Sequence, residues 1–216
     1  MSHLQLDFRL RFRTAFHTTG NRRTPEADKA VALRADGSPV IPATTLKGTL
    51  RSTAERLLRA FAVPVCQGPG PSTMCLGEGA CVVCRVFGNP RRPSPLRFVD
   101  AVPQEPVSRD ARSGVGISRQ RRAALAQRLF FVETVEAPAC EWRARCEGRF
   151  ADEGAAREAA ALVWMAARCC PVLGGGGSRG LGWVESWLVE ARLDGDRVEP
   201  AALEWHWKRW LGGDQP

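Results

Sequence analysis

The sequence contains no tyrosine, only three histidines, and no apolar run approaching the roughly 18–20 residues that cross a bilayer. The missing apolar run excludes a membrane-spanning helix. The opening stretch, MSHLQLDFRLRFR, also lacks the apolar segment and small-residue cleavage site of an export signal. We therefore expect a cytoplasmic protein, in a compartment where structural disulfides are rare.

The charge of the chain is strongly one-sided. It carries 31 lysines and arginines against 23 acidic residues, which gives a net charge of +8 and an isoelectric point near 9.5. Such a balance favours an anionic partner, and RNA, DNA or an acidic membrane surface would all fit. An arginine-rich overall composition would give the same numbers, so charge alone leaves the partner open.

The hydrophobic pattern predicts alternating strands and helices. Residues 4–13 alternate apolar and polar side chains, which is typical of a half-buried strand with arginines on its open face. A helix is expected to follow, with Thr44 or Thr45 as its N-cap and with its end at Pro64. A second, alanine-rich helix is expected over 152–168.

The other expected elements complete an α+β fold. They are a short strand at 96–103, a strand pair at 128–138 and 140–150 with a turn at Pro138, a strand after 182, and a tryptophan-rich last helix. This order predicts an antiparallel sheet covered by helices, which is a modified ferredoxin-like or RRM-like core. A polar loop at 18–39 and a basic arm at about 103–127 are long enough to be functional.

Four of the eight cysteines are gathered at positions 66, 75, 81 and 84. Thiolates are the ligands that tetrahedral zinc prefers, and the closing Cys-x-x-Cys lets two sulfurs reach one ion from a tight turn. A redox pair, a disulfide or four unrelated thiols are the alternatives. The surrounding segment, rich in glycine and proline, cannot build an apolar core of its own and needs a staple. We therefore expect Cys66, Cys75, Cys81 and Cys84 to hold a structural zinc.

Three groups of residues are suited to binding phosphate. Lys47 and Arg51 share a face near the start of the expected first helix, where an anion would relieve their repulsion. The run GGGGSRG at 174–180 offers backbone amides and Arg179. The basic arm contributes Arg119 and Arg121. Solvated lysines and arginines, and a merely flexible glycine connector, are the ordinary alternatives.

Taken together, these stretches resemble the RAMP superfamily of CRISPR-associated proteins, in particular the backbone subunit of type III (Csm/Cmr-like) effector complexes. The run GSPVIPATTLKGTLR at 37–51 resembles the family's G-x-P-x-I-P-G-[ST]-S-L-K-G-x-L-R signature. CVVCRVFG at 81–88 resembles its zinc-knuckle ending, and GGGGSRGLGW at 174–183 resembles its glycine-rich loop. RSGVGISR at 112–119, followed by FFVE at 130–133, is a weaker match to its thumb hairpin.

The resemblance implies one RAMP domain over 1–216, with a zinc-knuckle insertion at about 64–92 and a thumb arm at about 103–127. Its partners would be a guide RNA, a complementary target RNA, other effector subunits and further copies of itself. The RNA-contacting residues implied by the resemblance come from several segments. They are His17, Lys47, Arg51, Arg119, Arg121, Gly175, Gly176, Gly177, Ser178 and Arg179.

The resemblance also implies a catalytic aspartate in the loop before the signature, which is Asp28 in this chain. A carboxylate there would act as a general base or as a ligand of Mg²⁺, helping the 2′-hydroxyl of the target RNA attack its own phosphate. Two further hypotheses keep the family and change the role. One is a structural subunit that does not cut, and the other is a repeat-processing ribonuclease using His3 or His17. A zinc-dependent DNA-binding module is the alternative from another class.

Overall fold

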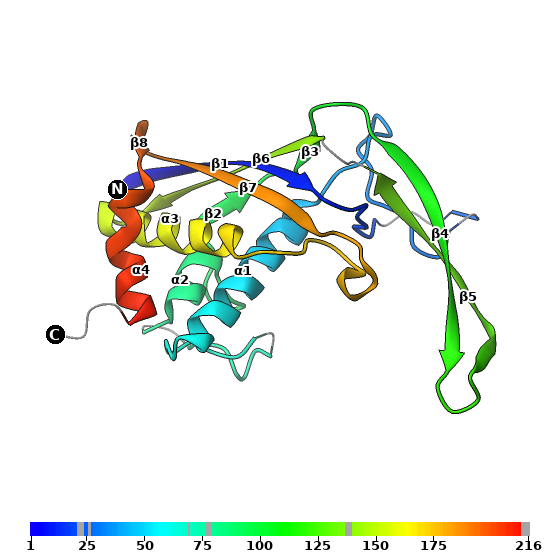
Figure 1. Cartoon of the computed structure of the whole chain (residues 1–216). Coiled ribbons are helices and arrows are strands. Elements are labelled where there is room, and N and C mark those ends of the chain that lie inside the picture. The colour runs from blue at the N-terminus through cyan, green and yellow to red at the C-terminus, as the bar shows by residue number, and fades with distance from the viewer. Residues whose placement is uncertain (21–23, 26, 69, 77–78, 137–139, 213–216) are drawn as a thin grey trace.

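The computed structural model describes residues 1–20, 24–25, 27–68, 70–76, 79–136 and 140–212. Its centre is a six-stranded sheet in the order β2-β6-β1-β7-β8, with β3 also pairing with β6 (Figure 1). Every strand pair in this sheet is antiparallel. The strands are β1 (Ser2–Phe12), β2 (Leu96–Phe98), β3 (Val102–Pro103), β6 (Glu141–Phe150), β7 (Val184–Leu193) and β8 (Asp196–Val198).

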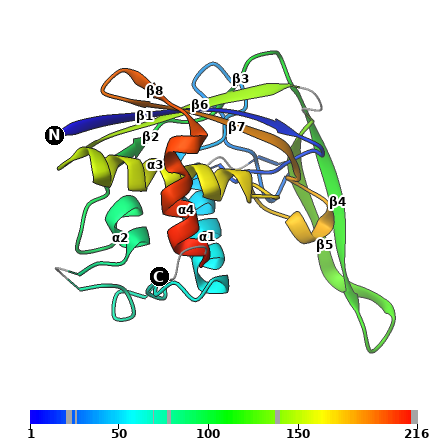
Figure 2. The ribbon, with the colours of Figure 1, turned by 60° about the vertical axis from the view of Figure 1, so that its left-hand side comes forward.

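The connections between these strands give the ferredoxin-like topology that the sequence predicts. Helix α1 (Ala43–Ala60) links β1 to β2, and α3 (Glu153–Arg168) links β6 to β7. Both helices cover the same face of the sheet and pack against each other (Figures 1 and 2). The shorter helices are α2 (Val82–Phe87), which packs on α1, α4 (Glu204–Leu211), which packs on α3, and the 3₁₀ helices η1 (Gly177–Arg179) and η2 (Pro200–Leu203).

Strand β1 shows how the sequence pattern produces the core. Leu4, Leu6, Phe8, Leu10 and Phe12 all point to the helical side and are almost fully buried. Each such side chain contributes about 1.5–3 kcal/mol relative to an exposed one. The residues between them face solvent, and that open face carries ion pairs between neighbouring strands. The predicted alternation is confirmed.

The start of α1 differs from the prediction. The helix begins at Ala43 directly after Pro42, whose side chain offers no cap, so the expected N-cap at Thr44 or Thr45 is wrong. The Ala43 amide instead donates a 2.7 Å hydrogen bond to the Asp100 carboxylate, which takes the place of the threonine cap. Helix α3 has the expected kind of cap, because the Asp152 carboxylate accepts a 2.8 Å hydrogen bond from the Ala155 amide.

The basic arm forms a long β-hairpin. Strands β4 (Ser108–Ser118) and β5 (Ala123–Glu136) pair only with each other as a sheet, and the hairpin extends well beyond the body of the molecule (Figures 1 and 2). The expected pairing of 128–138 with 140–150 is therefore wrong, because β6 inserts between β1 and β2 instead. The proposed turn at Pro138 lies outside the described residues.

No helix in the described part of the chain is both long and apolar enough to cross a membrane.

Candidate functional site

The four clustered cysteines converge on one point. The sulfur atoms of Cys66, Cys75, Cys81 and Cys84 all lie within 4.8 Å of one another. The Cys66 and Cys84 sulfurs are 3.3 Å apart, and those of Cys81 and Cys66 are 3.8 Å apart. Four sulfurs at the corners of a tetrahedron, each about 2.3 Å from a zinc ion, would be separated by about 3.8 Å. The arrangement therefore suits a closed tetrahedral metal site.

The surroundings of these sulfurs are compatible with a buried metal site. Burial raises the pKa of the Cys66 thiol to about 12, so a metal ion that bound this sulfur would have to displace its proton. All four cysteines are free thiols. A small apolar cluster of Met74 and Ala80 packs around Cys84, which is fully buried. These residues fit zinc in a structural role, with no ligand position left open for a substrate.

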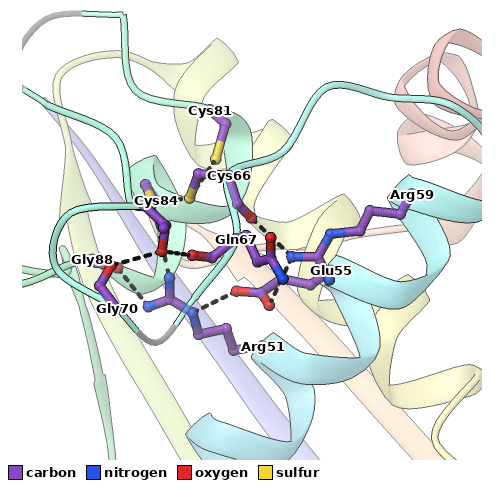
Figure 3. A network of polar contacts seen from close by, with 10 residues as sticks. Arg51, Glu55, Arg59, Cys66, Gln67, Gly70, Cys81, Cys84 and Gly88 are labelled. Atoms are coloured by element: carbon purple, nitrogen blue, oxygen red, sulfur yellow. Dashed lines mark hydrogen bonds and ion pairs between the residues drawn. The ribbon is translucent and has the colours of Figure 1, made fainter.

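Arg51 connects this cysteine cluster to helix α1. Its Nε donates to Glu55 at 2.9 Å, its Nη1 donates to the Gly88 carbonyl at 2.7 Å, and its Nη2 lies 3.8 Å from the Cys84 sulfur (Figure 3). The side chain is only 21% exposed. The guanidinium is thus enclosed by partners from α1 and from the cysteine segment. We conclude that Arg51 fastens the cysteine segment to the helix.

Two residues that the sequence analysis overlooked complete this network. Glu55 accepts from Arg51 with one carboxylate oxygen and pairs with Arg59 through the other, at 3.4 Å. Arg59 also donates a 2.8 Å hydrogen bond to the Cys66 carbonyl (Figure 3). The signal was present in the sequence, because Glu55 stands four residues from each arginine on one face of a helix.

Lys47 is in a different situation from Arg51. It lies one turn earlier on α1, and it forms no ion pair with any residue that the structure describes. Partial burial and the neighbouring charge of Arg51 lower the pKa of its ammonium group. A half-buried cation without a counter-ion is stabilised when an anion binds beside it. Lys47 is therefore available to a phosphate.

The glycine-rich loop lies against the segment that follows β1. The Gly175 amide donates a 2.8 Å hydrogen bond to the His17 carbonyl, and the Gly182 amide donates one of the same length to Ala15. Gly174 has φ +93°, and a Cβ there would lie 2.4 Å from the His17 carbonyl oxygen. Only glycine fits so close an approach. Gly175, Ser178 and Arg179 remain exposed on the outer side of this loop.

His17 is buried beneath that loop. Its Nδ1 lies 2.7 Å from the Glu133 carbonyl of β5, and its Nε2 lies 2.9 Å from the Thr19 hydroxyl. Burial lowers the pKa of the imidazole, which favours the neutral ring. Both ring nitrogens are therefore used within the protein. His17 joins the glycine loop to the base of the hairpin, and any effect on RNA would pass through the position of that loop.

Asp28 lies at the base of the same hairpin. Its amide donates to the Phe131 carbonyl at 3.0 Å, and its Oδ2 accepts a 2.7 Å hydrogen bond from the Phe131 amide. The residue is exposed, although the backbone around it is fixed to β5. The cysteine cluster is the only group of three or more metal-binding side chains within the described residues, so Asp28 belongs to no such group there. Magnesium at this position would depend on phosphate oxygens.

Arg119 and Arg121 lie at the tip of the hairpin, away from the other predicted contacts (Figure 1). The structure thus brings His17, the glycine loop and Asp28 together around the base of β5. It places Lys47 on α1 and Arg51 against the zinc knuckle.

A comparison with protein families supplies the identity. The model described as the RAMP superfamily matches residues 9–185 of the chain. This protein belongs to the RAMP superfamily. The matched range includes α1, the cysteine segment, the hairpin and the glycine loop. RAMP membership indicates a CRISPR-associated protein that binds RNA as part of a multi-subunit complex. A comparison with curated proteins gave no significant match.

Proposed function

We propose that this RAMP protein is a guide-RNA-binding backbone subunit of a type III effector complex. The observation that supports this most directly is the exposed glycine loop with Arg179, fixed by His17 to the base of a long hairpin. Together with Lys47, these elements offer separate cationic and amide contacts to a phosphate backbone. Copies of the chain would follow one another along the guide, and each hairpin would reach towards its neighbour.

Copurification with nucleic acid tests this function. The protein expressed with its effector partners and a CRISPR array should retain a discrete guide RNA and about one zinc per chain. Purified alone, it should bind single-stranded RNA more tightly than duplex DNA, since unpaired strands expose the backbone and bases to such a surface. Equal or tighter binding to duplex DNA would instead support a DNA-binding module.

We further propose that Asp28 takes part in cutting the bound target RNA. Its exposure at the hairpin base and its fixed backbone support a role for the carboxylate, which would accept the proton of the attacking 2′-hydroxyl. Zinc would remain structural, and Mg²⁺ bound to phosphate oxygens would offset the developing negative charge. A single carboxylate is a minimal set of catalytic groups. The second candidate function is therefore a subunit that binds target RNA without cutting it.

The Asp28→Asn variant separates these two possibilities. The guide-loaded complex should lose at least about a hundredfold in target cleavage with Mg²⁺, as expected when a general base is removed, and should still bind the target. The control is Asp36→Asn, in the same loop, where the carboxylate accepts hydrogen bonds from Ser38 and pairs with the nearby Arg34. If the Asp28 variant cleaved the target as fast as wild type, Asp28 would not be catalytic, and the role of the subunit would be structural.

A further inference from the structure

A cavity of about 660 Å³ lies between α1, the cysteine segment and residues 87–94. This volume falls within the roughly 300–1,000 Å³ of sites that bind small molecules. The cavity is on the side of α1 that faces the zinc knuckle. Its lining does not include the glycine loop, the hairpin or Asp28, and of the contacts proposed above it shares Lys47.

One part of the cavity is apolar and rigid. Met74 and Phe87 are buried, and they line the cavity together with Pro90 and Pro93. The Phe87 ring stacks on Phe98 of β2 with the ring centres 6.5 Å apart, which fixes it against the sheet. Flat aromatic groups and prolines offer a surface on which a planar heterocycle packs well.

The other part of the cavity is cationic. Arg51 and Glu55 line it, but they are already paired with each other. Lys47 and Arg92 also line it, and neither side chain forms an ion pair with a described residue. Ser52 adds a hydroxyl on the exposed side of α1. Two cations without counter-ions, beside an apolar surface, suit a ligand that combines an anionic group with a planar ring.

We infer that this cavity takes one nucleotide, with its base against Phe87 and Pro93 and its phosphate on Lys47 and Arg92. The inference rests on the proposed function in one respect, because the nucleotide would be a unit of the bound RNA. The cysteine segment supplies one wall through Gly68 and Met74, so the cavity depends on the zinc knuckle for its shape. The metal centre would thereby support nucleotide binding without touching the ligand.

Two substitutions and a matched control test the cavity. Ser52→Trp places a large side chain at its exposed edge, and Arg92→Ala removes one cation. Arg91→Ala is the control, since Arg91 is the exposed neighbour of Arg92 but does not line the cavity. Equilibrium dialysis would measure binding of adenosine 5′-monophosphate, adenosine and ribose 5-phosphate, and fluorescence anisotropy would measure binding of a single-stranded RNA.

We expect adenosine 5′-monophosphate to bind about tenfold more tightly than adenosine or ribose 5-phosphate, because it satisfies both parts of the cavity. Ser52→Trp and Arg92→Ala should weaken nucleotide and RNA binding about fivefold or more, while Arg91→Ala leaves both unchanged. If ribose 5-phosphate bound as tightly as the full nucleotide, the assignment of a base to the apolar part would be overturned.

The outcomes separate the cavity from the proposed function. If the wild type binds RNA and both cavity variants bind it equally well, the nucleotide site is overturned and the proposed function stands. If the wild type binds no RNA, the proposed function fails and the assignment of an RNA nucleotide to the cavity fails with it.

Discussion

At the scale of single residues, two cations on one helical turn perform different tasks. Arg51 is enclosed by Glu55, Gly88 and Cys84, whereas Lys47 has no ion-pair partner within the described structure. The planar guanidinium of arginine reaches several acceptors at once, while the lysine ammonium is a mobile point charge. The two residues look alike in sequence, but the structure gives Arg51 several protein partners and leaves Lys47 without a counter-ion among the described residues.

The Arg51→Lys variant should lose zinc more readily than wild type. A single ammonium group cannot reach the Glu55 carboxylate, the Gly88 carbonyl and the Cys84 sulfur together, and partners behind a metal ligand typically contribute 10–100-fold to metal affinity. We expect about a tenfold weaker zinc affinity and a lower melting temperature, measured by competition with a chromogenic chelator and by calorimetry. Zinc affinity equal to wild type would contradict the fastening role.

The Lys47→Met variant should bind RNA less tightly and remain as stable as wild type. The lowered pKa of Lys47 shows that its charge is disfavoured in the free protein, so removing it costs the fold little. RNA affinity should fall about tenfold through loss of a charged phosphate contact. Lys208→Met, on exposed α4, is the control for charge alone and should leave affinity nearly unchanged. Equal losses in the two variants would point to non-specific attraction.

At the scale of elements, the glycine loop and the zinc knuckle are both held in place by distant segments. The loop depends on the chain after β1 and, through His17, on β5. The knuckle depends on α1 through Arg51 and Arg59. Neither segment has enough apolar residues to fold by itself, so each is expected to lose its shape when its attachment is removed.

Gly174→Ala should disturb the glycine loop far more than Gly180→Ala. Both glycines have positive φ, but a Cβ at Gly174 meets the His17 carbonyl, whereas a Cβ at Gly180 meets nothing within 4 Å. We expect a loss of about 2 kcal/mol or more in the free energy of unfolding for the first and about 1 kcal/mol for the second. Chemical denaturation measures both, and similar losses would contradict the close approach at Gly174.

Removal of the metal should release the knuckle while leaving the sheet folded. Met74, Ala80 and the cysteines form a small cluster apart from the main core, whereas Val82 and Val83 of α2 pack within that core. Protons compete with the metal ion for the thiolates. Chelation, or acidification below neutral pH, should therefore expose residues 66–80 to limited proteolysis with little change in the far-ultraviolet circular dichroism. If this segment resisted protease after complete metal removal, the metal would not be what holds the segment in its fold.

At the scale of the whole molecule, the sequence predicted what local patterns determine. The alternation in β1, the helical spacing of α1 and α3, and the cysteine spacing led to the ferredoxin-like core and the cysteine cluster. The partner of β5 was not predictable, because strand pairing depends on contacts between distant segments. The same applies to Arg51, whose partners Gly88 and Cys84 lie 37 and 33 residues away in the chain.

The salt dependence of RNA binding tests the central claim most directly. For single strands, the slope of log affinity against log salt changes by about 0.7 for each phosphate contact. The double variant Lys47→Met/Arg179→Ala should bind single-stranded RNA more weakly, with a slope about 1.4 smaller than that of wild type. An unchanged affinity and slope would contradict the account that this RAMP protein grips RNA through α1 and its glycine loop.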